Sequence, residues 1–89
     1  MNFKIALSKG AAKALKKGVI SRDKLTDLLE EFVLKMDGSD VQVDVIKLKG
    51  YWKGHYRIRT GNLRIIVKPD FLNKVIEVKR VGPRGDVYK

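Results

Sequence analysis

Three arginines in a short stretch of this chain have the residue type and the spacing to bind an anion together. Arg57, Arg59 and Arg64 flank Gly61-Asn62, a pair that predicts a two-residue hairpin turn between alternating apolar and polar residues. In that register Arg59 faces Arg64, and all three arginines share one face of the hairpin. Two arginines directly opposite each other destabilise a sheet by roughly 0.2–1 kcal/mol, so we expect an anion at this face.

The other face of the same hairpin is apolar. It is expected to consist of Tyr56, Ile58, Ile65 and Val67. His55 and Lys68 lie near the arginines in the same register. The pattern therefore predicts one face for stability and one face for binding.

The charge of the chain is concentrated in the half that contains this hairpin. The net charge is +10, and residues 45–89 hold twelve Lys and Arg against three Asp and Glu. Residues 1–44 hold eight against seven. Such a basic half predicts a nucleic acid or an acidic protein as the partner, and solubility alone is the alternative interpretation.

The composition excludes several kinds of chemistry. The chain has no cysteine and a single histidine, which argues against disulfides, a thiol nucleophile and a structural zinc site. No Gly-rich loop opens a helix after a strand, and we expect no cofactor. No apolar run is long enough to span a membrane, and Lys4 and Lys9 interrupt any secretory segment, so we expect a soluble cytoplasmic protein.

Two helices are expected near the amino terminus. Ser8 can cap a helix that runs to about Lys17, and Gly18 can stop it. Ser21 can cap a second helix, which Asp37-Gly38-Ser39-Asp40 ends. The apolar residues of this second helix follow helical spacing and should form its buried stripe: Leu25, Leu28, Leu29, Phe32 and Met36.

Strands are expected at Phe3–Leu7, at about 54–60, at about 63–68 and at Lys74–Val81, with Pro69–Asn73 as a turn. Residues 41–53 can be read as a strand or as an extended arm. Residues 1–89 are thus predicted to form a single α+β domain. Its N-terminal strand and helical hairpin would pack on one face of a twisted antiparallel sheet of about four strands.

A cluster of Arg, Lys and Tyr suits the cleavage of RNA by the 2′-hydroxyl of RNA itself, since the substrate then supplies the nucleophile. Arginine can neutralise the charge that grows on the phosphorus oxygens. Removing the first proton is harder, because the pKa of Lys or Tyr must fall by about 3 units, roughly 4 kcal/mol. His55 alone is more typical of a solvated side chain, and Glu77 and Asp86 are more typical of ion-pair partners.

The carboxyl-terminal tail adds Arg84 and Tyr88 after a turn at Gly82-Pro83. Tyr88 can stack on a base, which is worth about 1–3 kcal/mol, or place its hydroxyl near the scissile bond. A frayed terminus with Tyr88 as a packing residue is the alternative.

Residues 46–50, 56–66 and 81–88 together resemble the RelE/ParE superfamily of toxins from type II toxin–antitoxin systems. The resemblance implies two helices packed on a twisted antiparallel sheet. In the RelE branch it implies a metal-independent, ribosome-dependent endoribonuclease that cuts mRNA in the ribosomal A site. The products are a 2′,3′-cyclic phosphate and a 5′-hydroxyl.

The same resemblance assigns roles by position. Arg64 would stabilise the phosphate, Arg84 would protonate the leaving 5′-oxygen or steady its charge, and Tyr88 would orient or stack the substrate or act as the base. The expected contacts to the RNA backbone are Arg57 and Arg59, and more weakly Lys47 and Lys49.

One position departs from the family pattern, because Pro83 stands where many relatives have a histidine that can transfer a proton. The resemblance also implies an acidic, partly disordered antitoxin as a partner. Two other functions stay open: a ParE-like toxin that inhibits DNA gyrase without catalysis, and an inactive basic RNA-binding domain. Arg84 together with Tyr88 favours the ribonuclease.

Overall fold

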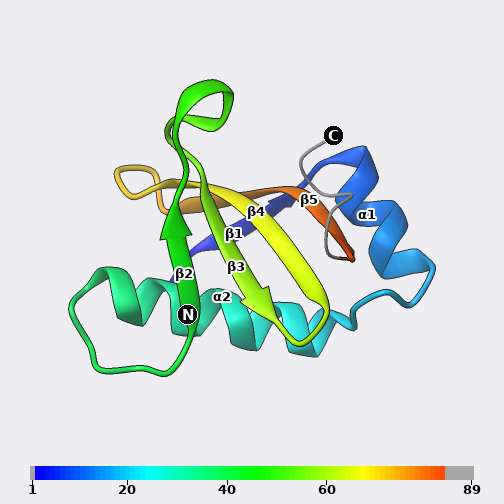
Figure 1. Ribbon diagram of the computed structural model, residues 1–89, viewed down its shortest axis with the longest axis horizontal. Coiled ribbons are helices and arrows are strands. Elements are labelled where there is room, and N and C mark those ends of the chain that lie inside the picture. The colour runs from blue at the N-terminus through cyan, green and yellow to red at the C-terminus, as the bar shows by residue number, and fades with distance from the viewer. Residues whose placement is uncertain (1, 84–89) are drawn as a thin grey trace.

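The computed structural model describes residues 2–83 of the chain and has the predicted α+β architecture (Figure 1). Its elements in chain order are β1 (Lys4–Leu7), α1 (Lys9–Lys16), α2 (Arg22–Met36), β2 (Asp44–Lys47), the 3-10 turn η1 (Gly50–Trp52), β3 (Tyr56–Thr60), β4 (Leu63–Asp70) and β5 (Val75–Pro83). Neither helix is both long and apolar enough to cross a membrane within the described residues.

The sheet has five strands, rather than about four, in the order β1-β5-β4-β3-β2. The additional strand is β2, which settles residues 44–47 as a strand that pairs with β3. The sheet is mixed and not purely antiparallel, because β1 runs parallel to β5. The alternation in residues 3–7 indicates which side chains share a face, but it carries no information on the direction of the neighbouring strand.

Both helices begin at the predicted caps. The Ser8 hydroxyl accepts a hydrogen bond from the Ala11 backbone nitrogen at 3.0 Å, and the Ser21 hydroxyl accepts one from the nitrogen of Lys24 at 3.0 Å. Caps of this kind each stabilise a helix by about 1 kcal/mol. After α1 the chain turns at Gly18, whose φ of +79° is costly for other residues.

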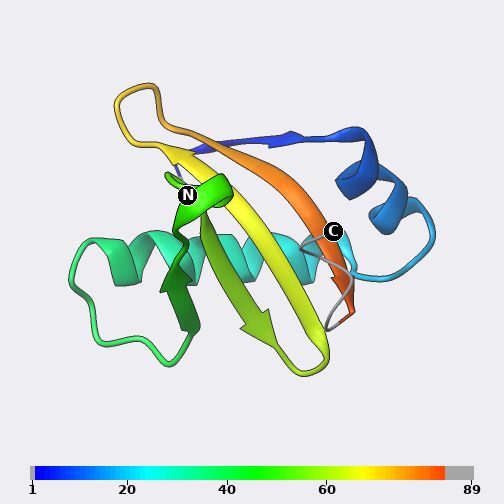
Figure 2. The same ribbon diagram turned by 45° about the horizontal axis from the view of Figure 1, so that its top comes forward.

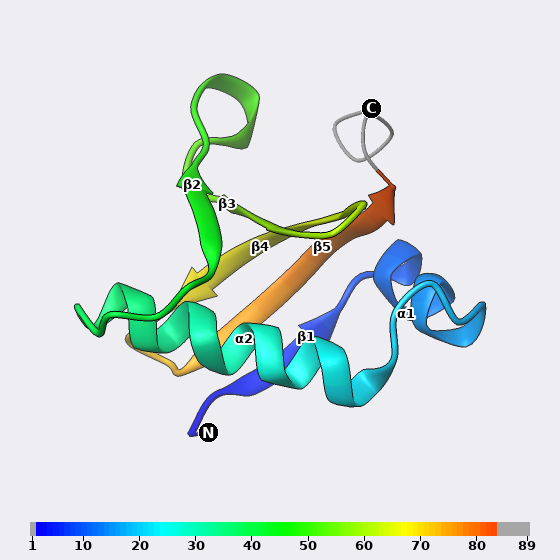
Figure 3. The same ribbon diagram turned by 60° about the horizontal axis from the view of Figure 1, so that its bottom comes forward.

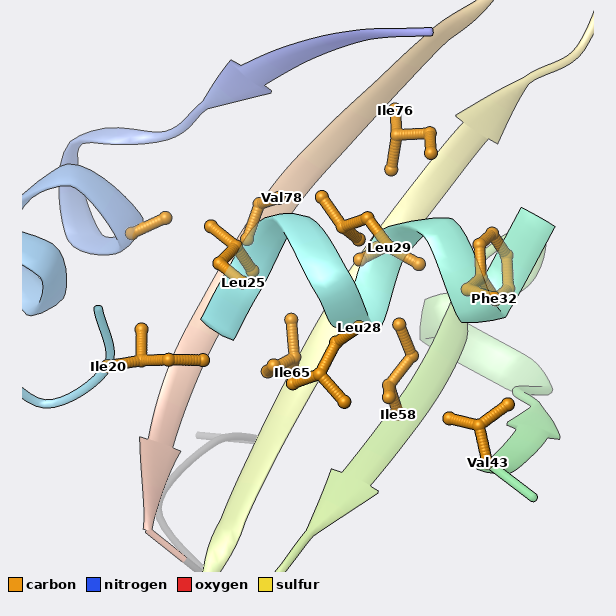
Figure 4. Close-up of a cluster of buried hydrophobic side chains, with 12 residues drawn as sticks. Ile20, Leu25, Leu28, Leu29, Phe32, Val43, Ile58, Ile65, Ile76 and Val78 are labelled. Atoms are coloured by element: carbon orange, nitrogen blue, oxygen red, sulfur yellow. The ribbon is translucent and has the colours of Figure 1, made fainter. Parts of the chain in front are cut away.

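The core lies between α2 and one face of the sheet (Figure 4). The predicted stripe of α2 is buried at Leu25, Leu28, Leu29 and Phe32, whereas Met36 at the end of the helix is only partly buried. The strands contribute Ile58, Ile65, Val67, Ile76 and Val78. The first helix packs against β5 and β1, and it buries Ala11 and Ala14.

The hairpin of β3 and β4 has the predicted register. Thr60 pairs with Leu63 and Arg59 pairs with Arg64. Gly61 has a φ of +55° and Asn62 does not have a positive φ, which is the pattern of a type II′ turn. Alternation from this turn directs Ile58 into the core and Arg59 to the opposite face of the sheet. We call this face the outer face; in Figure 3 the sheet is seen with α2 along its other side.

The turn that follows β4 is shorter than predicted. Pro69 and Asp70 belong to β4, where they pair with β5. The pairing of β3 with β4 stops at Val67, so β4 has a free edge at Pro69, where proline is tolerated. Asp70 closes the remaining turn by accepting hydrogen bonds from the backbone and side-chain nitrogens of Asn73 at 3.0 and 2.8 Å.

We predict that Leu29→Ala lowers the free energy of unfolding by about 2–5 kcal/mol, because Leu29 is fully buried between α2 and the sheet. Leu34→Ala is the matched control: it makes the same chemical change on the same helix at a side chain that is 46% exposed. Urea denaturation followed by circular dichroism measures both variants. Equal losses would contradict the position given to α2.

Candidate functional site

The register of the sheet aligns outer-face side chains in rows that cross the strands. A first row, from β2 to β5, is formed by Asp44, Arg59, Arg64 and Gly82. A second row, displaced by two residues along each strand, is formed by Ile46, Arg57, Ile66 and Arg80. Figure 2 looks onto this face, with the strands in front of α2. The predicted gathering of Arg57, Arg59 and Arg64 on one face is therefore present.

Asp44 sits between two of these arginines, and the sequence analysis did not identify it. An Arg57 Nη donates a hydrogen bond to Asp44 Oδ1 at 2.7 Å, and Arg59 Nε lies 3.2 Å from Asp44 Oδ2. The Arg57 side chain is 10% exposed, and that of Arg59 is 52% exposed. Asp44 therefore supplies a local counter-charge for Arg57 and Arg59, although their Coulomb attraction is weakened by water at the exposed side.

Arg64 has no such counter-charge among residues 2–83. It faces Arg59 across the hairpin, and its Nε is buried without a hydrogen-bond acceptor. Arg57 also keeps a buried Nε without an acceptor. An unmet buried donor costs about 1–3 kcal/mol, but an atom so enclosed is not itself open to a ligand. Arg64 differs from Arg57 and Arg59 in having no carboxylate partner among residues 2–83, so its guanidinium is the one on this face best prepared to bind a phosphate.

Lys47 and Lys49 do not join the arginines. Lys47 pairs with Tyr56, whose ring lies 5.4 Å from that of Phe32, so this pair belongs to the α2 side of the sheet. Lys49 is exposed and directly precedes η1. Their place was hard to predict because a shift of one residue in a strand moves a side chain to the opposite face.

Arg84 and Tyr88, the two predicted site residues of the tail, lie outside the described residues. Within the described part, β5 runs to Pro83, and Gly82 pairs with Arg64 in the first row. Arg84 follows Pro83 directly in the sequence.

Glu77 is an ion-pair partner, as its basic surroundings in the sequence predicted. Lys79 Nζ donates a hydrogen bond to Glu77 Oε2 at 2.6 Å. That bond and the charge of Lys79, with smaller contributions from Lys68 and His55, hold the pKa of Glu77 below its usual value. Glu77 is therefore ionised at neutral pH and is not a proton donor for a reaction there.

A second group of side chains on the outer face was also missed. The guanidinium carbon of Arg80 lies 5.6 Å from the ring centroid of Trp52, next to Tyr51 and His55. These residues and Lys79 line a hollow of about 300 Å³. The Gly50-Tyr51-Trp52 segment was visible in the sequence, but its contact with Arg80 joins residues far apart in the chain.

A larger hollow of about 530 Å³ lies away from the arginines. The segment just before β1, the carboxyl-terminal part of α2 and the turn after β4 line it, among them Phe3, Leu34 and Phe71. Two of its lining residues, Glu30 and Asp37, are acidic. We place the functional site by charge rather than by volume, because a polyanionic strand binds an open basic surface.

No protein-family model matches the chain, and no curated protein matches its sequence. Solved structures do match it. A chain of the archaeal RelE–RelB complex from Pyrococcus horikoshii OT3 is 28% identical, with a TM-score of 0.61, and the match covers 98% of this chain and all of the other. The YoeB–YefM complex from Staphylococcus aureus, at 19% identity and a TM-score of 0.62 over 91% and 95% of the two chains, shares the fold.

A chain of the RelB–RelE antitoxin–toxin complex from Methanococcus jannaschii has 30% identity and a TM-score of 0.63. This match covers 93% of the present chain and 94% of the archaeal one. Sequence and fold thus agree over nearly the whole of both chains, and the protein belongs to the RelE-like toxin superfamily.

Proposed function

We propose that this protein is the toxin of a type II toxin–antitoxin system and that it cleaves mRNA in the ribosomal A site. The observation that carries the proposal is Arg64, a basic group of the outer face that faces Arg59 and has no carboxylate partner among residues 2–83. A phosphate oxygen is the acceptor that a guanidinium matches best. The kinship with RelE chains supports the same reaction class.

In the proposed reaction the 2′-oxygen of RNA attacks the adjacent phosphorus, and the bond from phosphorus to the 5′-oxygen breaks. The 2′-hydroxyl loses a proton and the 5′-oxygen gains one, which leaves a 2′,3′-cyclic phosphate and a 5′-hydroxyl. Arg64 stabilises the charge on the non-bridging oxygens. By position in the family, Arg84 serves the leaving 5′-oxygen, and Tyr88 orients the substrate or removes the first proton.

Asp44 orients the two neighbouring arginines in this proposal. Arg57 and Arg59 are held by its carboxylate at 2.7 and 3.2 Å, so they are oriented before RNA arrives. The phosphates of RNA then compete with a single half-exposed carboxylate for the two guanidinium groups. The same basic face would attract an acidic antitoxin by complementary charge. A cognate antitoxin is part of the proposal because the relatives from Pyrococcus and Methanococcus are complexes of RelE with RelB.

Arg64→Ala is predicted to abolish growth arrest and to slow cleavage by about 10²- to 10³-fold, because it removes one preorganised donor for the charge of the transition state. Inducible expression, with mapping of the 5′ ends of transcripts on translated messages, measures both effects. Lys24→Ala is the control: it removes an exposed positive charge from α2, on the other side of the sheet, and should leave both toxicity and cleavage within about two-fold.

Two outcomes of wild-type expression would contradict the proposed ribonuclease activity. If wild-type expression arrests growth while transcripts stay intact and DNA loses supercoiling, the protein acts on gyrase. Harmless expression together with salt-sensitive RNA binding would instead indicate an inactive RNA-binding domain.

Asp44→Asn is predicted to tighten the binding of single-stranded RNA by about two- to five-fold. The change removes the attraction of Arg57 and Arg59 to the carboxylate, worth roughly 0.5–1 kcal/mol, with which RNA phosphates must compete. Asp40→Asn changes the net charge equally at an exposed residue outside the outer face and should have a smaller effect. Fluorescence anisotropy with a 2′-O-methylated RNA, which lacks the nucleophile, measures binding alone. Equal tightening in both variants would show that only net charge matters.

Tyr88→Phe and Tyr88→Ala separate the two proposed roles of this side chain. If the hydroxyl takes the proton, both changes slow cleavage alike. If the ring stacks on a base, Tyr88→Phe keeps most of the activity and Tyr88→Ala weakens substrate binding by about five-fold or more. Single-turnover cleavage on programmed ribosomes distinguishes these outcomes, and full activity of Tyr88→Ala would remove Tyr88 from the site.

A further inference from the structure

The connection between β2 and β3 carries three aromatic rings away from the core. It rises on the outer side of the sheet, opposite α2 (Figure 3). The rings of Tyr51 and Trp52 lie 5.3 Å apart at 80°, and those of Trp52 and His55 lie 5.1 Å apart at 83°. Tyr51 is 91% exposed. A cluster of rings that the core does not use is suited to contact a partner.

This connection is held in shape by its own backbone. The nitrogens of Lys53 and His55 donate to the carbonyl oxygens of Gly50 and Trp52, both at 3.0 Å. Leu48 donates to the His55 carbonyl oxygen at 3.0 Å, which closes the connection at its base. A surface ordered in this way loses little conformational entropy when it binds a ligand.

Arg80 joins the rings to the arginine rows. It reaches from β5 so that its guanidinium carbon is 5.6 Å from the Trp52 centroid, and it forms no ion pair among residues 2–83. In the second row it stands beside the buried Ile66, which in turn pairs with Arg57. The hollow of about 300 Å³ near Trp52 therefore adjoins the face that we propose to bind RNA phosphates.

The lining of this hollow combines flat rings with cations. Its residues are Tyr51, Trp52, His55, Lys79 and Arg80. Lys79 is already paired with Glu77 at 2.6 Å, so Arg80 is the basic side chain of the lining that has no carboxylate partner among residues 2–83. Unpaired bases stack on aromatic rings and on arginine planes, and the attached phosphates are attracted by Lys and Arg. A protein segment rich in acids would match the cations but would leave the ring faces without a flat partner.

We propose that this hollow, which we call the aromatic hollow, binds one unpaired nucleobase of the RNA that the arginine rows hold. The inference rests on the proposed RNA-directed function, and it adds a base contact to a site otherwise made of phosphate contacts. Base stacking tolerates every base, so the hollow contributes affinity and register rather than strict sequence preference.

Trp52 is the single tryptophan of the chain, so its fluorescence reports on the aromatic hollow directly. Titration of the full chain with a 2′-O-methylated single-stranded RNA should quench this fluorescence to saturation. By anisotropy of labelled RNA, Trp52→Ala should weaken binding by about five- to a hundredfold, and Trp52→Phe should retain most of it. Phe71→Ala, an exposed aromatic residue remote from the hollow, should bind as the wild type does.

Arg80→Gln keeps the reporting tryptophan and should weaken both the quenching and the affinity, which guards against a folding defect in Trp52→Ala. Absence of saturable quenching, or RNA binding that is unchanged in both variants, would overturn the inference. Quenching by polyglutamate but not by RNA would assign the hollow to an acidic protein and would overturn it as well.

The test separates this inference from the proposed function because it measures binding without cleavage. If transcripts are cleaved in cells but RNA does not quench the Trp52 fluorescence in vitro, the protein is a ribonuclease whose aromatic hollow does not bind the RNA. If RNA quenches the fluorescence but no transcript is cleaved, the aromatic hollow binds RNA and the proposed ribonuclease activity is wrong.

Discussion

The alternation of apolar and charged residues along β3 and β4 fixes both faces of the sheet at once. Because side chains of a strand point alternately to its two faces, the residues that meet α2 and the arginines of the outer face are specified together. The type II′ turn at Gly61-Asn62 sets the register of that alternation. A slip of one residue would bury arginines against α2 and expose the isoleucines.

This arrangement separates the source of stability from the source of function. The helix α2 and the inner side chains of the sheet supply a dry core that holds the strands in register. The outer face can then carry an unfavourable pair such as Arg59 and Arg64, which alone would weaken the sheet. Asp44 offsets part of the repulsion, and Arg64 has no carboxylate partner among residues 2–83.

The two rows across the strands place two kinds of side chain on one face of this small domain. Arginines from β3 and β4 form the region that we propose to bind phosphates, and the ordered rings between β2 and β3 stand next to Arg80 of β5. Salt weakens a contact with the phosphate backbone because that contact is electrostatic, whereas the stacking of a base on a ring does not depend on charge. Kinship with RelE-like toxins agrees with the first region, while the second comes from the structure of this chain.

Features that depend on neighbours along the chain could be predicted from the amino-acid sequence. The caps at Ser8 and Ser21, the buried stripe of α2, the hairpin register and the common face of the three arginines all follow from local spacing. Family membership was visible in the motifs as well. These signals are local because each depends on one turn of helix or one pair of adjacent strands.

Contacts between segments that are distant in the chain became known from the folded molecule alone. It set the direction of β1, the pairing of Asp44 with Arg57 and Arg59, the place of Lys47 on the α2 side, and the contact of Arg80 with Trp52. The physical reason is the same in each case. Periodicity states which residues of one strand share a face, but register and direction between strands far apart in sequence arise from packing of the whole sheet against its helices.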